Sequence, residues 1–491
     1  MKHRFAALPL LGLCWLLPRC ALTDHYQLAS DAAGMSNGAA GAGAAGNVAL
    51  SGTAGTDPGA SGASANAGGS AVGGSAVGGS AGIAEIGGAG TGTGGCAAKC
   101  TAAQTCCSAA CVDTATDPKN CGACGTQCSE GRACAGGTCS AGWVSMSAPP
   151  SGFVSRTKAA ACAMGSSVFI WGGSDANNMA LDTGAIYSAT TDTWVPVLKS
   201  AGMPTPRTFA TCVWTGSVVI VFGGTDNKMT QAALSSGAIY DPRDMSWTPL
   251  PNAPSARSQP VGYWDGTRAL FWGGTNGLQS AAIAGAERFN LTSWASASGG
   301  GDPGAVVFPA YAFDGSVLYL QGGLIGNTRQ DRVSSYTGSA DKWATLSKSL
   351  TARWGAFGVW DGSRFLVWGG SDSAMLHKDG AYMTGSTWTT MNTTGAPSAR
   401  MLWARRSGWA FQVKPGVSAF LGGQISAQNA ALLSADGASY DAGTNQWQAL
   451  AGWPSGEDHE YGVGVWTGQE FVLWSGNSGG NLTGTGERLA L

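Results

Sequence analysis

Five arginines recur at one position of a repeating pattern in the C-terminal part of the chain. Each stands at about the same distance before the turn that follows a short apolar segment; they are Arg156, Arg207, Arg257, Arg353 and, shifted by one residue, Arg400. A guanidinium is planar and binds a carboxylate or sulfate through two parallel hydrogen bonds. If the fold gathers these side chains at one opening, they would form a positive site for an anionic ligand.

Two repeats depart from this pattern. Val306 takes the position in one, and His459 takes it in the last, within the run Glu457-Asp458-His459-Glu460. Carboxylates and an imidazole beside the arginines could act as acid and base groups. The alternative is a solvated loop whose carboxylates balance the charge of the arginines.

The arginines also have a structural interpretation. Each could cap its own repeat by hydrogen bonding to neighbouring loop carbonyls or to an aspartate. Repetition favours capping, because a structural role recurs in every repeat whereas a ligand-binding role need not. An anion site and capping can coexist.

Composition excludes several functional classes. The 491 residues hold 27 Lys and Arg against 29 Asp and Glu, so no basic surplus points to nucleic acid. No Gly-rich phosphate loop, His-Glu-x-x-His motif or nucleophile elbow occurs. We therefore expect no cofactor, no metal and no nucleic-acid partner.

The N-terminus is typical of an export signal. A basic start, 2–4, precedes the apolar run Phe5–Leu17, which is too short to span a bilayer. We assign 1–22 as a signal peptide. The sequence Leu17-Pro18-Arg19-Cys20 loosely resembles a bacterial lipobox, so lipid attachment at Cys20 and ordinary cleavage both stay open. No later segment predicts a transmembrane helix.

Residues 23–95 are rich in Gly, Ala and Ser, and we expect a disordered linker there because such a segment cannot bury enough surface to fold. Next comes a module, 96–140, with ten cysteines: Cys96, Cys100, Cys106, Cys107, Cys111, Cys121, Cys124, Cys128, Cys134 and Cys139. An even number in a short exported segment predicts five disulfides of unknown pairing. Zinc at Cys121-x-x-Cys124 is the competing hypothesis.

The cysteine spacing carries a resemblance. The Cys106-Cys107 pair and the run Asn120-Cys121-Gly-Ala-Cys124-Gly resemble the repeat of plant stigma-specific proteins. That family is extracellular and associated with binding. A rigid stapled stalk is the alternative role for the module.

Residues 141–491 repeat with a period of about 50 residues. Each repeat contains an apolar run followed by a Gly pair, at Gly172-Gly173, Gly223-Gly224, Gly273-Gly274, Gly322-Gly323, Gly369-Gly370 and Gly422-Gly423, with Ser475-Gly476 as a degenerate copy. Thr-Gly and Asp-Gly turns separate runs rich in Val, Ile, Phe and Trp, as in β-hairpins. This pattern resembles the kelch family and the central domain of galactose oxidase, in which each unit is one four-stranded propeller blade.

Tryptophans on the fourth strands predict the number of blades: Trp143, Trp194, Trp247, Trp294, Trp343, Trp388 and Trp447. Trp143 precedes the first Gly pair, and no Trp follows the final strand Gly486–Leu491. We therefore expect an all-β, seven-bladed propeller whose last blade takes its fourth strand from the N-terminal side. Cys162 and Cys212 occupy matching first-strand positions, where we expect buried free thiols; a disulfide between them is the alternative.

The resemblance to galactose oxidase raises the question of a copper site, and the residues of this chain do not support one. That site uses two His and two Tyr, with one Tyr directly before a His, and neither His377 nor His459 follows a Tyr. The leading hypothesis is an exported propeller, either secreted or associated with the cell envelope, that binds a glycan or an extracellular protein without catalysis. It would bind through its loop face and through the mouth formed by Arg156, Arg207, Arg257, Arg353, Arg400 and His459. The second is a carbohydrate-active enzyme, oxidase- or epimerase-like, that uses His459, Glu460 and the arginines. The third is a scaffold without a compact ligand site.

Overall fold

The computed structural model describes residues 100–491 apart from 102–103, 109, 118, 129–133, 136, 140–141, 227–231, 278–280, 349, 373, 403–407, 427–431 and 454. The expected signal peptide, Cys20, the linker and Cys96 lie outside the described residues. Within the described part the chain is all-β, and no helix there could cross a membrane. The chain divides into two compact units, with the boundary between Val144 and Ser145.

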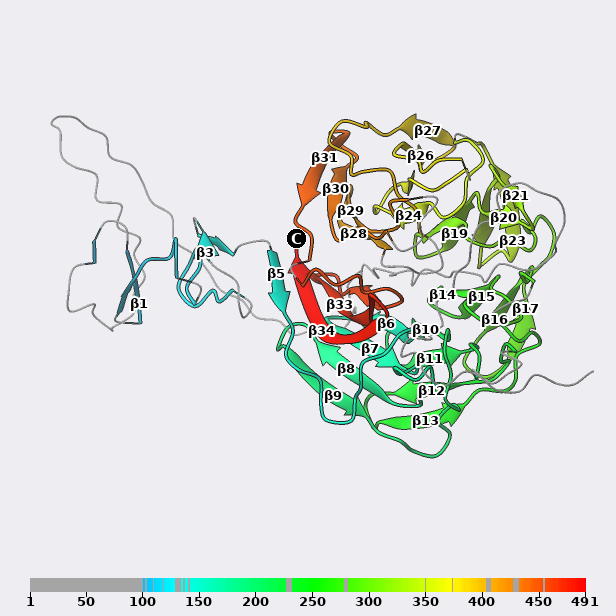
Figure 1. The fold of residues 1–491 in the computed structure, drawn as a ribbon, viewed down its shortest axis with the longest axis horizontal. Helices are drawn as coiled ribbons and strands as arrows, with labels where there is room; N and C mark the ends of the chain where they lie inside the picture. The colour runs from blue at the N-terminus through cyan, green and yellow to red at the C-terminus, as the bar shows by residue number, and fades with distance from the viewer. Residues whose placement is uncertain are drawn as a thin grey trace, which may run out of the picture. The chain divides into compact units, whose positions relative to one another are not determined.

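The larger unit is a propeller of seven four-stranded antiparallel sheets, as the repeats predicted (Figure 1). Blades one to three comprise β6 (Ala160–Met164), β7 (Ser167–Trp171), β8 (Gly184–Ser188) and β9 (Thr193–Val197); β10 (Thr211–Trp214), β11 (Val219–Phe222), β12 (Gly237–Asp241) and β13 (Ser246–Pro249); and β14 (Val261–Trp264), β15 (Ala269–Trp272), β16 (Ala286–Phe289) and β17 (Trp294–Ser296).

Blades four to six comprise β18 (Ala310–Phe313), β19 (Val317–Gln321), β22 (Val333–Thr337) and β23 (Lys342–Leu346); β24 (Phe357–Trp360), β25 (Phe365–Trp368), β26 (Gly380–Thr384) and β27 (Thr387–Thr390); and β28 (Gly408–Lys414), β29 (Val417–Gly422), β30 (Gly437–Asp441) and β31 (Gln446–Leu450). Blade four also carries a small hairpin, β20 (Leu324–Ile325) and β21 (Thr328–Arg329), between its second and third strands.

The seventh blade confirms the predicted closure. Its strands are β32 (Val463–Trp466), β33 (Glu470–Ser478), β34 (Asn481–Ala490) and, as the outer strand, β5 (Gly142–Ser145). Directly after β5, the Met146 N–H donates to the carbonyl of Gly486 in β34. A sheet that joins both ends of the repeat leaves no unpaired inner edge where the ring closes.

Aromatic side chains fill the spaces between blades. In four blades the aromatic residue before the Gly pair contacts the fourth-strand tryptophan of the next blade, as in Trp171–Trp247 and Trp368–Trp447, whose ring centroids are 5.7 and 5.4 Å apart. Trp171 and Trp368 are fully buried. Burial of such large rings is the main stabilising contribution between sheets.

The smaller unit contains two short hairpins in its described part, β1 (Thr105–Cys107) with β2 (Ala110–Val112) and β3 (Cys134–Ala135) with β4 (Thr138–Cys139). Disulfides join Cys100 to Cys111, Cys107 to Cys124 and Cys121 to Cys134, and Cys106 and Cys128 are also disulfide-bonded. Cys121 and Cys124 therefore belong to a disulfide framework and not to a zinc site.

The expectation of free thiols in the propeller was wrong. Cys162 in β6 and Cys212 in β10 form a disulfide that joins the inner strands of blades one and two. The inner strands β6 and β10 contact each other, so matching positions on these two blades come within bonding range.

Candidate functional site

The repeated arginines are buried inside their own blades. Arg156, Arg207, Arg257, Arg353 and Arg400 are between 0% and 2% exposed. In every case Nη1 donates to the carbonyl of the first glycine of the pair in the same blade, at 2.7–3.1 Å; the acceptors are Gly172, Gly223, Gly273, Gly369 and Gly422. A buried carbonyl at the end of the second strand thus gains a charge-assisted hydrogen bond.

The main chain of the same arginines binds the neighbouring blade. The second glycine of the preceding pair donates to the arginine carbonyl, as in Gly173 to Arg207 and Gly224 to Arg257, both 2.9 Å. Arg353 and Arg400 accept in the same way from Gly323 and Gly370. Each of these four arginines therefore links two blades, one through its carbonyl and the other through its guanidinium.

Burial and local carboxylates set the electrostatics of these groups. Burial lowers the pKa of Arg156 to about 9 and that of Arg207 to about 10, so both stay charged at neutral pH. Arg257 lies 3.5 Å from Glu287, Arg353 lies 3.0 Å from Asp379, and Arg400 lies 3.0 Å from Asp436. In these three blades a nearby carboxylate balances the positive charge.

His459 replaces the arginine in blade seven and is fully buried. Its Nδ1 donates to the carbonyl of Ser475 at 2.7 Å, and its Nε2 lies 3.4 Å from Glu487 and 3.7 Å from Glu457. Glu460, from the same run, accepts from the side-chain amide of Asn477. The imidazole and two carboxylates thus meet; His459 and Glu487 are buried, and Glu457 is partly exposed.

Blade four has neither a guanidinium nor an imidazole at this position. Val306, 5% exposed, packs in the interface between blades three and four with Leu320 and Trp272. Gln321 replaces the aromatic residue before the Gly pair of this blade and is 1% exposed. Blade four therefore departs from the repeat both at the arginine position and at the residue before its Gly pair.

The positions of the five arginine side chains show how accessible the expected anion site is. The structure keeps each guanidinium in its own blade, hydrogen-bonded to loop carbonyls and, in three blades, close to a carboxylate, which is the arrangement that the capping alternative describes. An anionic ligand would have to displace those bonds to reach the arginines. The sequence located the position, but the side chains there do not face a common opening.

A set of residues that the sequence did not single out links neighbouring blades through the backbone, and we call it the collar. It consists of one residue per blade, two places after the arginine position: Lys158, Phe209, Gln259, Phe308, Gly355, Leu402 and Tyr461. The N–H of Lys158 donates to the carbonyl of Tyr461, Phe209 donates to Lys158, and Gln259 donates to Phe209, at 2.9–3.0 Å. Gly355 donates to Phe308, and Leu402 donates to Gly355, in the same direction around the ring.

Most collar residues adopt a left-handed backbone, with φ of 61° at Lys158 and 54° at Tyr461. The Lys158 ammonium lies 5.6 Å from the ring centroids of Phe209 and Tyr461. A cavity of about 40 Å³ next to the collar is lined by residues of five blades. It has room for a few water molecules and not for a sugar ring.

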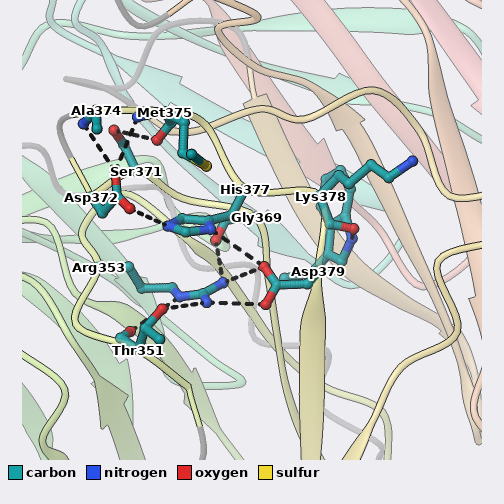
Figure 2. A network of polar contacts seen from close by, with 11 residues as sticks. Thr351, Arg353, Gly369, Ser371, Asp372, Ala374, Met375, His377, Lys378 and Asp379 are labelled. Atoms are coloured by element: carbon teal, nitrogen blue, oxygen red, sulfur yellow. Dashed lines mark hydrogen bonds and ion pairs between the residues drawn. The ribbon is translucent and has the colours of Figure 1, made fainter.

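A polar network occupies the loop between β25 and β26 in blade five (Figure 2). The imidazole of His377 lies between two carboxylates, with Nε2 3.5 Å from Asp372 and Nδ1 3.5 Å from Asp379. Arg353 binds Asp379 with both terminal nitrogens, at 3.0 and 3.2 Å. Burial and the charge of Arg353 lower the pKa of His377, against the opposing effect of the two aspartates.

The network shapes the loop tip. Oδ1 of Asp372 accepts from the N–H groups of Ala374 and Met375, and the hydroxyl of Ser371 donates to the carbonyl of Met375 (Figure 2). Met375 itself is 58% exposed. Nothing in the described residues gathers three or more His, Cys, Asp or Glu side chains in a way that could hold a metal ion.

Two family models match the chain. The KLHDC2/KLHL20/DRC7 Kelch-repeats domain matches residues 138–293, and the Stigma-specific STIG1-like protein family matches residues 84–142. No curated protein was found to match. Together with the seven four-stranded sheets and the disulfides, these matches agree with both resemblances seen in the sequence. The chain therefore carries a kelch-repeat β-propeller of seven blades, preceded by a cysteine-rich module of the stigma-specific type.

Proposed function

We propose that this chain is an exported, non-catalytic binding protein whose propeller binds a protein ligand. The binding surface is the loop face, defined as the end of the propeller that carries the loops between second and third strands and those between consecutive blades. Antiparallel order puts both kinds of loop at the same end of every blade. Kelch propellers commonly serve as protein-binding scaffolds.

The distribution of exposed apolar side chains supports this face. Seven large apolar residues that are at least 40% exposed belong to its loops: Val154, Met179, Leu198, Ile325, Met375, Ile425 and Leu432. The turns at the opposite end contribute Met245 at 38% and Leu291 at 36%. Exposed apolar groups that gather on one face are typical of protein interaction sites.

Export is supported by the disulfides. The cysteine-rich module matches a family of stigma-specific proteins, and eight of its cysteines are disulfide-bonded. Disulfides persist in oxidising compartments. The bond between Cys162 and Cys212 extends this argument to the propeller. Secretion or attachment to a cell envelope through Cys20 both fit this proposal.

The glycan and enzyme hypotheses gain no comparable support. The five arginines and His459 are buried, and the cavity beside the collar is too small for a sugar. A protein ligand needs no deep pocket, because it can bury apolar side chains on an open face.

The experiment pans a phage-displayed library of random peptides against the folded full chain, beside a glycan array. We expect saturable peptide binding that is unchanged by Met245→Ser and Leu291→Ser, which alter the opposite face. Failure to enrich any peptide, or binding that only the opposite-face variants weaken, would contradict the proposal. Glycan binding without peptide binding would restore the glycan hypothesis.

A further inference from the structure

The loop face has two chemically different halves. In each blade an isolated bridge pairs a residue before the first strand with a residue after the second or, in blade seven, with Asn477 near the end of β33. In blades seven, one, two and three both partners are polar: Glu460–Asn477, Thr157–Ser174, Thr208–Thr225 and Ser258–Thr275. In blades four, five and six the pairs contain apolar residues: Val307–Leu324, Trp354–Ser371 and Met401–Gln424.

An apolar cluster continues across the second half. Val307, Phe308, Trp354 and Met401 are buried together, and Leu324 and Leu376 pack against them. These residues come from the loops of blades four, five and six, which follow one another around the ring. The cluster therefore joins three neighbouring loops through apolar contacts.

Exposed apolar residues lie directly beside this cluster in the chain. Ile325 follows Leu324, and Met375 precedes Leu376; they are 41% and 58% exposed. Ile425 follows Gln424, the bridge partner of Met401, and its N–H donates to the carbonyl of Leu432. We call Ile325, Met375, Ile425 and Leu432 the apolar patch.

The loops around the apolar patch carry a positive excess. Their described residues include six cations, Arg329, Arg332, Lys348, Arg353, Lys378 and Arg400, against five anions, Asp302, Asp331, Asp372, Asp379 and Asp436.

All five anions are already engaged. Asp302 accepts from the indole N–H of Trp272 and from the N–H of Gly304. Asp379 and Asp436 bind buried arginines, Asp331 pairs with Lys348, and Asp372 accepts from loop N–H groups. The side chains of Arg329 and Lys378 are exposed in the same loops as Ile325 and Met375. Two exposed cations therefore accompany the apolar patch in these loops.

We propose that the apolar patch is the docking surface for a segment of a partner protein that combines apolar and acidic side chains. Apolar side chains of the partner would cover Ile325, Met375, Ile425 and Leu432. Its carboxylates would face Arg329 and Lys378, which steer association and select against basic partners. Methionine at the tip can adjust to the shape of the partner. This inference rests on the proposed function and names the partner chemistry.

The test uses peptides enriched by the library on the full chain and measures their affinity for variants. Ile325→Ser and Met375→Ser remove apolar contacts, and Lys378→Glu reverses a charge. Met179→Ser is the matched control, because Met179 is 64% exposed on the same face but belongs to blade one. Thermal unfolding of each variant checks that the propeller is intact.

We expect the enriched peptides to contain apolar and acidic residues. Met375→Ser and Lys378→Glu should each weaken binding by about fivefold or more, and rising salt should weaken it further. Met179→Ser should change affinity by less than about twofold, since residues outside a contact are near neutral. Lys378→Glu should admit basic peptides that the parent rejects.

Two outcomes would overturn the inference and leave the proposed function standing. One is peptide binding that Met179→Ser weakens and the patch variants do not. The other is enrichment of basic peptides whose affinity Lys378→Glu leaves unchanged. Absence of any enriched peptide would overturn both.

Discussion

His459 donates a 2.7 Å hydrogen bond from Nδ1 to the carbonyl of Ser475, sixteen residues further along the chain. Arg156 and Gly172 are separated by the same sixteen residues and make the same kind of bond. The imidazole therefore performs in blade seven the capping role that a guanidinium performs in blade one. A sequence departure that suggested chemistry turns out to preserve a structural contact.

The first prediction concerns this contact. His459→Ala should destabilise the chain by about 1–3 kcal/mol, because it leaves the buried Ser475 carbonyl without its donor. His459→Arg should retain most of the stability, since a guanidinium makes this bond in five other blades and would face Glu487. Urea unfolding measures both. A destabilisation by His459→Arg as large as that by His459→Ala would contradict the capping role.

The arginine caps lead to a second prediction. Arg207→Met keeps the length of the side chain but removes the donors to the carbonyls of Gly223 and Ser236, which lie 3.0 and 2.8 Å away. We expect a loss of about 2–4 kcal/mol in the free energy of unfolding. Arg243→Met is the control, because the Arg243 side chain is 74% exposed and its pair with Asp241 should contribute little. Equal stability of the two variants would argue that Arg207 serves a ligand instead.

Sequence alone predicted the blade number and the closure because both depend on particular residue types. The Gly pairs mark positions with positive φ, such as 71° at Gly172, and Trp247 marks a fourth strand whose ring must fill the space between sheets. The arginine position was equally visible. Its role was not, because the acceptors are backbone carbonyls that leave no mark on residue type.

The collar and the two halves of the loop face escaped prediction for a related reason. Lys158, Gln259 and Leu402 share no side-chain chemistry; what Lys158 and Gln259 share is a left-handed backbone, and all three donate an N–H to the preceding blade. Ile325 and Met375 lie far apart in the sequence and become neighbours of one apolar cluster only in the ring. Such relationships appear only when the blades are placed side by side.

The disulfide in the propeller gives a third prediction. A bond between Cys162 and Cys212 closes a loop with a sequence separation of 50, and loop-closure entropy assigns about 4 kcal/mol to such a cross-link. The double variant Cys162→Ala and Cys212→Ala should therefore unfold at a clearly lower temperature than the parent. A non-reducing digest analysed by mass spectrometry should contain the linked peptides. Recovery of an alkylated Cys162 peptide from the unreduced chain would show that the bond is absent.

The blade-five network gives a fourth prediction, on pH. In the folded chain the pKa of His377 lies below its ordinary value of 6.5. The unfolded chain then binds more protons as the pH falls below about 6.5, so this group favours folding above that pH and loses its contribution in acid. As the pH falls from 7.5 to 5.5, the parent should therefore lose more of its free energy of unfolding than His377→Gln does. Urea unfolding at the two pH values measures the difference, and a larger loss by the variant would reverse the assigned direction.

The final prediction tests the backbone contact between blades. Gly172 has φ of 71°, and a Cβ built on it would lie 2.8 Å from the carbonyl oxygen of Arg207. Gly165 has a similar φ of 61° with open space around it. Gly165→Ala should cost about 1–2 kcal/mol from backbone conformation alone. Gly172→Ala should cost clearly more, because the Arg207 carbonyl must also move and weaken its 2.9 Å bond from Gly173. Thermal unfolding compares the two, and equal losses would mean that the blades can separate at this point without penalty.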